Sequence, residues 1–266
     1  MRIRAGMTAV VTGGGSGIGL ALASELARRG CRLALVDVRE DRLATANGSL
    51  AGATAVSTHT VDVADETSVM KLANEVRQIH GPAALLVNSA GVSVAGPFAM
   101  TGAESFAWIM RVNFDGTVNC CRSFLPQLRE NKEGHIVNVG SCFGWIGFPT
   151  KSGYCASKFA VRGFTEALRG ELKPDKIGVT VLYPGPVSTN IVRDGRVDDE
   201  TAREREAAFL AKRGISPQRV SRAAMRGIER NAARVLVGLD YRIIDWIVRL
   251  APSWSLALAA RFGRRF

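Results

Sequence analysis

The fold of this chain of 266 residues is indicated most clearly by one segment, Thr8-Ala9-Val10-Val11-Thr12-Gly13-Gly14-Gly15-Ser16-Gly17-Ile18-Gly19. Its first five residues are apolar or β-branched and predict a buried strand, and an apolar helical pattern begins at Gly17. Glycines between the two let the backbone turn tightly, and the free N–H groups at the start of a helix attract phosphate. This strand–turn–helix order is typical of a turn that holds the pyrophosphate of a dinucleotide. We expect cofactor contacts from Gly13, Ser16, Gly17, Ile18 and Gly19.

The same alternation of strand and helix continues along the rest of the chain. Short apolar runs predict seven strands: Thr8–Thr12, Arg32–Asp37, Ala55–Val61, Ala84–Asn88, His135–Gly140, Val179–Tyr183 and Val235–Gly238. Helical patterns lie at Gly17–Arg29, Glu66–Ile79, Ala103–Arg129, Tyr154–Leu172 and Pro217–Asn231. Strands that are apolar almost throughout are typical of parallel sheets covered on both faces. The sequence therefore predicts one α/β domain with a doubly wound parallel sheet of about seven strands.

The composition excludes several classes of protein. With 47% hydrophobic and 22% charged residues the chain is not disordered, and the apolar stretch 250–260 is too short to span a membrane. Five cysteines without a CxxC motif indicate reduced thiols and a cytoplasmic protein. Three scattered histidines predict no metal site.

The positive charge is concentrated near the C-terminus. Nine Arg and three acids lie between Arg222 and the end, so the last 45 residues carry +6 of the net charge of +11. No basic low-complexity tail or zinc-finger spacing accompanies this charge, and we expect no nucleic-acid partner.

Asp37, at the end of the second predicted strand and 18 residues after Gly19, indicates which dinucleotide binds. A carboxylate there accepts hydrogen bonds from the adenosine-ribose hydroxyls and repels a 2′-phosphate, which favours NAD. Arg39 stands two residues later and can pair with a phosphate, so NADP stays open. Strand ends farther along predict more cofactor contacts: Asp62, Val63, Asn88, Ala90 and Gly91.

Four polar residues predict carbonyl–alcohol redox chemistry. Tyr154 and Lys158 lie four residues apart on one helix face, Ser141 follows the fifth strand, and Asn113 lies in a helical pattern. A phenol is a weak base at neutral pH, but a neighbouring ammonium and a positive nicotinamide would each lower its pKa. Ser141 would then hold the substrate oxygen, and Asn113 would support proton exchange.

Together these motifs resemble the short-chain dehydrogenase/reductase family. The resemblance covers Met7 to Ile191 and rests on TGGGSGIG, Asp62-Val63, NSAG, Ser141 and YCASK. It implies a Rossmann-type sheet in the order 3-2-1-4-5-6-7 and a catalytic tetrad of Asn113, Ser141, Tyr154 and Lys158. Tyr154 and Lys158 would also contact the cofactor, and Lys158 would bind the nicotinamide ribose. Further contacts are implied for Pro184, Gly185, Val187 and Thr189. Members of the family are commonly dimers or tetramers.

The residues just past the strand ends predict an apolar substrate pocket. Val94, Cys142, Phe143, Phe148 and Ile191 are expected to line it, joined by Val92, Phe98, Trp145 and Pro186. No fixed Arg or Lys is expected there to bind a carboxylate. A hydrophobic alcohol or ketone is the predicted substrate.

Two segments lie outside the regular alternation. Residues 194–214 are highly charged and predict a substrate lid within the catalytic domain 1–238. Residues 239–266 form two short amphipathic patterns divided by Pro252 and rich in Trp and Arg. This appendage is consistent with a pocket lid, a subunit interface or a peripheral membrane contact through residues 240–266.

The sequence thus predicts an NAD(H)-dependent oxidoreductase that interconverts an alcohol and a ketone or aldehyde on a hydrophobic substrate. Two alternatives stay open: an NADPH-dependent carbonyl reductase, and a non-catalytic NAD-binding sensor or scaffold at a membrane surface.

Overall fold

The computed structural model describes residues 1–50, 55–197 and 200–263. The predicted lid and appendage therefore extend over residues 198–199 and 264–266, which lie outside the described residues.

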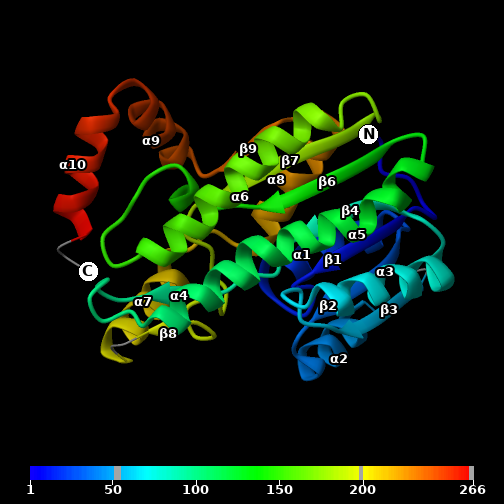
Figure 1. The fold of residues 1–266 in the computed structure, drawn as a ribbon, viewed down its shortest axis with the longest axis horizontal. Coiled ribbons are helices and arrows are strands. Elements are labelled where there is room, and N and C mark those ends of the chain that lie inside the picture. The colour runs from blue at the N-terminus through cyan, green and yellow to red at the C-terminus, as the bar shows by residue number, and fades with distance from the viewer. Residues whose placement is uncertain (51–54, 198–199, 264–266) are drawn as a thin grey trace.

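A seven-stranded parallel sheet forms the centre of the molecule (Figure 1). Its order is β3-β2-β1-β4-β6-β7-β9, which confirms the predicted Rossmann-type arrangement. The strands are β1 Thr8–Thr12, β2 Arg32–Asp37, β3 Ala55–Thr60, β4 Ala83–Asn88, β6 Gly134–Val139, β7 Ile177–Pro184 and β9 Arg234–Val237. A separate pair of very short strands, β5 Val94–Ala95 and β8 Arg196–Val197, was not predicted.

Helices cover both faces of the sheet. One layer contains α1 Gly17–Arg28, α2 Glu40–Ser49 and α8 Pro217–Glu229; the other contains α3 Glu66–His80, α5 Gly116–Glu130 and α6 Ser152–Glu171. Alternate strand residues point to the two layers: Val11 and Leu35 pack with the first, Val10 and Leu86 with the second. Strands β1, β4 and β7 are buried throughout because both of their faces are covered, whereas the edge strand β3 is mostly polar and partly exposed.

One helix was predicted incompletely, and another was not predicted. The helix predicted over Ala103–Arg129 is α4 Ala103–Met110, a π-helical turn Arg111–Asp115 and α5. The helix α2 was not predicted because it buries only Leu43 and Ala46 of its mostly polar residues.

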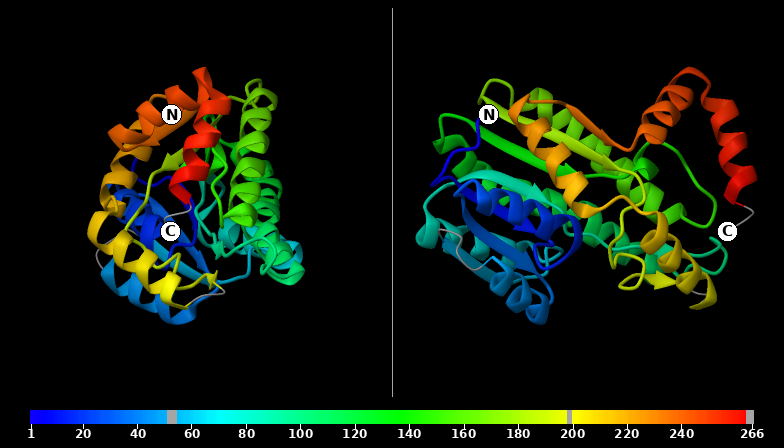
Figure 2. Two further views of the ribbon diagram at one scale, coloured as in Figure 1. Left: turned by 90° about the vertical axis from the view of Figure 1, so that its left-hand side faces the viewer. Right: turned by 180° about the vertical axis from the view of Figure 1, so that it is seen from behind.

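The last helices lie at one end of the sheet. α7 Glu200–Arg213, α9 Leu239–Leu250 and α10 Pro252–Gly263 lie beyond the carboxyl ends of the strands (Figures 1 and 2). α9 and α10 project from the body of the protein, and we call residues 239–263 the arm. Among the described residues, none of the helices is both long and apolar enough to cross a membrane.

Candidate active site

A cavity of about 1040 Å³ opens at the carboxyl ends of the strands. Its wall brings together most of the predicted site residues: Gly13, Ser16, Gly17, Ile18, Asp37, Arg39, Asp62, Val63, Ala90, Gly91, Ser141, Cys142, Phe143, Phe148, Tyr154, Lys158, Pro184, Gly185, Val187, Thr189 and Ile191. These residues come from distant parts of the sequence, and the parallel sheet places them at one edge.

The glycine turn between β1 and α1 forms one end of the cavity. Gly13 has φ +62°, and a Cβ there would lie 2.9 Å from the backbone nitrogen of Ala90. Gly17 has φ +53°, and its Cβ would lie 3.0 Å from Cγ2 of Thr189. Thr12 Oγ1 accepts hydrogen bonds from the N–H groups of Ser89 and Ala90, both at 3.1 Å, which fixes the neighbouring strand end. The turn thus presents bare backbone and the N-terminus of α1, a cradle that fits a pyrophosphate.

Asp37 lies beside this turn at the end of β2. Its Oδ2 accepts a hydrogen bond of 3.1 Å from the N–H of Gly15. The two nearby guanidinium groups are engaged elsewhere: Arg39 donates to both carboxylate oxygens of Asp41 at 2.9 and 2.8 Å. Arg42 does the same to Asp194, at 2.7 and 2.8 Å. Neither of these guanidinium groups is hydrogen-bonded to the carboxylate of Asp37.

Ser141, Tyr154 and Lys158 form the centre of the cavity wall. Ser141 follows β6, where its Oγ accepts a hydrogen bond of 3.2 Å from the N–H of Phe143. Tyr154 and Lys158 lie one turn apart near the start of α6. The Lys158 ammonium donates to the carbonyl oxygen of Val139 at 3.0 Å and lies 5.8 Å from the centre of the Tyr154 ring. These contacts place a hydroxyl, a phenol and an ammonium on one surface.

The protonation of this centre is governed by burial. Burial raises the pKa of Tyr154 well above its usual value, and a hydrogen bond with Ser141 opposes this rise only in part. Burial also lowers the pKa of Lys158 to about 8. The Lys158 ammonium was expected to lower the pKa of the Tyr154 phenol. With the protein's own groups alone this pKa is instead raised, because desolvation of the phenol is the larger effect.

Asn113 lies behind the cavity wall in the π-helical turn. Its Oδ1 accepts from the N–H of Val92 at 2.8 Å, and its Nδ2 donates to the carbonyl of Val92 and to Ser157 Oγ, both at 3.0 Å. The amide is buried, and its bonds fix the segment after β4 against α6.

Several predicted wall residues lie elsewhere. Gly19 packs against the carbonyl of Gly13, and Asn88 is buried with its Nδ2 donating to Asn138 Oδ1 at 2.8 Å. Val94 is buried in β5, where it pairs with Arg196, and Phe98 is exposed to solvent. Position next to a strand end was too coarse a signal for Asn88, Val94 and Phe98, since it does not say which way a side chain points. Gly19, predicted from the glycine motif, lies on the inside of that turn.

An ion pair on the substrate side of the wall was not predicted from the sequence. Lys151 Nζ donates to both carboxylate oxygens of Glu206 on α7, at 2.8 and 2.6 Å. The prediction of a pocket without a fixed Lys was therefore wrong, but this Lys is already paired. The two residues are 55 positions apart, and no sequence pattern joins them.

The rest of the wall on this side is mainly apolar. The helices α7, α9 and α10 contribute Phe209, Leu210, Tyr241, Ile244, Ile247, Leu258 and Ala259. Cys142 is also a wall residue, and burial raises the pKa of its thiol to about 11, which keeps it neutral.

Comparisons with known proteins agree with this arrangement. The family model described as short chain dehydrogenase matches residues 7–200. The protein SadH of Mycobacterium tuberculosis, named as an oxidoreductase, is 37% identical over 98% of this chain and 96% of its own length. The C alpha-dehydrogenase of Sphingobium is 31% identical over 95% of this chain and 89% of its own length.

A solved structure has the same fold. It is a short chain dehydrogenase/reductase from Burkholderia phymatum in complex with NAD, with a TM-score of 0.86, 29% identity and coverage of 94% of this chain and 96% of that chain. The fold, the arrangement of the cavity and these similarities lead to one assignment. The chain belongs to the short-chain dehydrogenase family, a family of oxidoreductases.

Proposed function

We propose that this protein is an NAD(H)-dependent oxidoreductase that interconverts an alcohol with a ketone or aldehyde on a hydrophobic small molecule. One observation carries the proposal: Ser141, Tyr154 and Lys158 line the same cavity as the glycine turn and Asp37. Bound NAD would supply or accept the hydride. The protein must then hold the substrate oxygen and move its proton.

Each polar group of the wall has a task in this reaction. Tyr154 exchanges the proton with the substrate oxygen, and its raised pKa keeps the phenol protonated, the form that donates during reduction. Ser141 holds the same oxygen by a hydrogen bond. Lys158 contacts the cofactor ribose and, when charged, favours the phenolate. Asn113 positions the Val92 segment and the start of α6.

The surroundings of Asp37 support NAD over NADP. A 2′-phosphate would approach a carboxylate, and the guanidinium groups of Arg39 and Arg42 already bind Asp41 and Asp194. A 2′-phosphate would therefore compete with these two carboxylates for the guanidinium donors. The Burkholderia relative, solved in complex with NAD, supports the same choice.

The substrate side of the cavity supports a hydrophobic substrate. Trp145, Ile146 and Phe148 from the loop after β6 line this space together with Phe209 of α7 and Ile244 of α9, and Ile146 and Ile244 pack in the same apolar cluster as Trp145. The Lys151–Glu206 ion pair that borders it is internally neutral, and Arg205 of α7 is a further basic residue of the wall.

The first experiment is a cofactor-reduction assay with the purified protein, NAD or NADP, and a panel of aliphatic, aromatic and polycyclic alcohols. We expect turnover with NAD, and a loss of at least about 100-fold in kcat in Tyr154→Phe, because a positioned acid–base group contributes roughly 10²–10⁴-fold. Tyr183→Phe is the matched control, since this buried tyrosine lies in β7 and is not among the wall residues.

Three outcomes would contradict parts of the proposal. Turnover with NADP alone would overturn the cofactor assignment. Equal activity of Tyr154→Phe and the unchanged protein would overturn the role of the phenol. Tight binding of NADH without turnover of any alcohol or ketone would favour a non-catalytic sensor.

A further inference from the structure

The arm presents two different faces. Its inner face borders the active-site cavity through Tyr241, Ile244 and Ile247 of α9 and Leu258 and Ala259 of α10. Its outer side points away from the body of the protein, as the right-hand view in Figure 2 shows for the two helices. An apolar helix face is normally covered by another surface, and the cavity wall uses only the inner face of the arm.

The outer face exposes large apolar side chains. Ile243, Trp246 and Leu250 lie at positions i, i+3 and i+7 of α9, so they share one side of the helix. On α10, Trp254 and Leu256 are also exposed, but they lie two residues apart and so project from different sides of that helix. The five side chains are 55–77% exposed. Exposed apolar residues scattered singly are common, but five on two adjoining helices mark an interaction surface.

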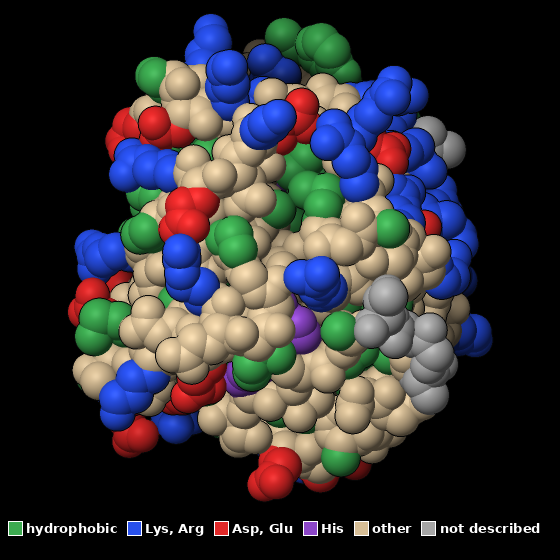
Figure 3. Space-filling view, turned by 90° about the vertical axis from the view of Figure 1, so that its right-hand side faces the viewer, with side chains coloured by type: hydrophobic (Ala, Val, Ile, Leu, Met, Phe, Trp, Pro, Cys, Tyr) green, Lys and Arg blue, Asp and Glu red, His purple; other side chains and the backbone are tan. Residues whose placement is uncertain are grey.

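The charge on the arm is mainly positive: Asp240, in the first turn of α9, is its one exposed acid. Asp245 is the last acidic residue of the sequence, and it is buried and bound to Arg234 at 2.6 Å. Arg242, Arg249 and Arg261 are exposed, and the Arg249 guanidinium lies 5.6 Å from the centre of the Trp246 ring. By contrast, acidic and basic side chains are mixed over much of the opposite end of the molecule (Figure 3).

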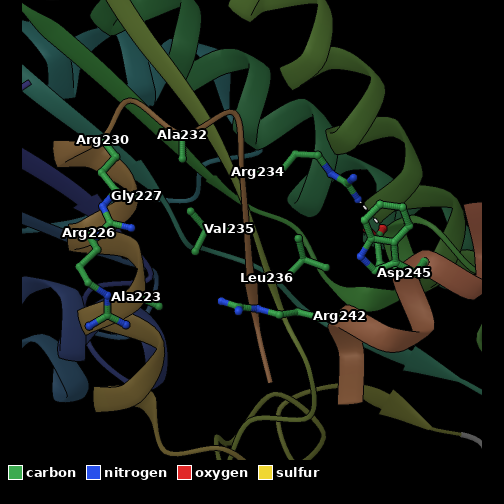
Figure 4. Close-up of a pocket in the computed structure, with 11 residues that line it drawn as sticks. Ala223, Arg226, Gly227, Arg230, Ala232, Arg234, Val235, Leu236, Arg242 and Asp245 are labelled. Carbon is green, nitrogen blue, oxygen red and sulfur yellow. Dashed lines mark hydrogen bonds and ion pairs between the residues drawn. The ribbon is translucent and has the colours of Figure 1, made fainter. Parts of the chain in front are cut away.

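A second cavity beside the arm is also rich in arginine. It measures about 370 Å³ and lies between α8, β9 and α9; we call it the arginine groove (Figure 4). Arg226 and Arg230 line it from α8, and Arg242 extends from α9 toward them. Its one acid, Asp245, is bound to Arg234. The other three guanidinium groups have no ion pair among the described residues, which suits a phosphate-sized anion.

We propose that the outer face of the arm and the arginine groove dock on an anionic phospholipid membrane. Trp246, Leu250 and Trp254 would enter the interface between headgroups and acyl chains, and the arginines would bind lipid phosphates. A second copy of the chain fits this surface poorly, because a symmetric contact would bring the arginines of both copies together.

Docking would place the cavity next to the lipid. The same two helices would contact the membrane on one side and the cavity on the other, so a hydrophobic substrate could pass from the bilayer to Tyr154. This consequence rests on the proposed function. The docking itself does not, because vesicle binding is measured without cofactor or substrate.

The test is vesicle co-sedimentation of the full chain. Vesicles of phosphatidylcholine alone are compared with vesicles that also contain phosphatidylserine, at low and high salt. We expect binding to the anionic vesicles that weakens at high salt. Leu250→Ser should weaken binding about tenfold, from the transfer free energy of a leucine side chain, and Arg242→Gln about fivefold.

Matched controls lie on other surfaces of the molecule. Met70→Ser on α3 removes an exposed apolar side chain, and Arg122→Gln on α5 removes one positive charge, and neither should change binding. Equal binding to neutral and anionic vesicles, or equal loss in the arm and control variants, would overturn the proposal. So would a chain that binds no vesicles and forms a dimer that Leu250→Ser dissociates.

Discussion

The two ends of the active-site cavity are held together by different forces. At the cofactor end, backbone lies against backbone: Gly13 packs on Ala90, and Gly19 packs on the carbonyl of Gly13. At the substrate end, α7 and the arm are held by ion pairs such as Lys151–Glu206 and Arg234–Asp245 and by a small apolar cluster. Adding a side chain at the cofactor end should therefore strongly lower the stability of the protein. Removing a single charge at the substrate end should lower it only slightly.

Gly19→Ala would test the cofactor end most severely. A Cβ at this position would lie 2.1 Å from the carbonyl oxygen of Gly13, so the turn or α1 must move. We expect a loss of about 3 kcal/mol in the free energy of unfolding, at the upper end of the range for overpacking. NADH binding should weaken strongly as well, because the same turn forms the cradle. Chemical denaturation and NADH fluorescence titration measure the two effects.

Gly163→Ala provides the matched control. Gly163 lies in the exposed part of α6, and a Cβ there would meet nothing within 4 Å. It should stabilise the protein by roughly 0.5–1 kcal/mol through helix propensity. If Gly19→Ala were as well tolerated, the cofactor end would not be held by close backbone contact.

This difference also explains how much the sequence predicted. The strand–turn–helix unit around Gly13 was predicted because glycine and strand patterns report on local backbone geometry. The strand order, which the structure confirms, was implied by the family resemblance. The inward direction of Tyr241 and the outward direction of Ile243 depend on how α9 packs, which no local pattern encodes. Pairs such as Arg42–Asp194, 152 residues apart, likewise require the folded chain.

The pH dependence of the protein's stability tests how strongly Lys158 is desolvated at the centre of the cavity wall. Its pKa is near 8 in the folded protein, against 10.5 when exposed, so the unfolded chain binds more protons between these values. Stability should therefore rise with pH in this window, by up to about 2 kcal/mol between pH 8 and 9.5. The cost of burying the ammonium is fully present below pH 8.

Lys158→Met isolates this contribution. The variant lacks the titrating group, so the difference in unfolding free energy between it and the unchanged protein should shift with pH across this window. Measurements stay below pH 10, where the tyrosines with raised pKa begin to titrate in the unfolded chain and act in the opposite direction. A difference that is constant with pH would mean that Lys158 is not desolvated.

Glu206→Gln tests the substrate end. It leaves the buried Lys151 ammonium without its carboxylate, a loss that reaches about 3–5 kcal/mol for fully buried pairs. Because the Glu206 side chain is one-third exposed, we expect only about 1 kcal/mol, with a larger effect on the KM for the substrate than on kcat. Glu200→Gln breaks the exposed pair with Arg203 on the same helix and should cost less than about 0.5 kcal/mol. Since the two variants make the same chemical change on α7, equal costs would mean that the ion pair at Lys151 does not hold this helix over the cavity.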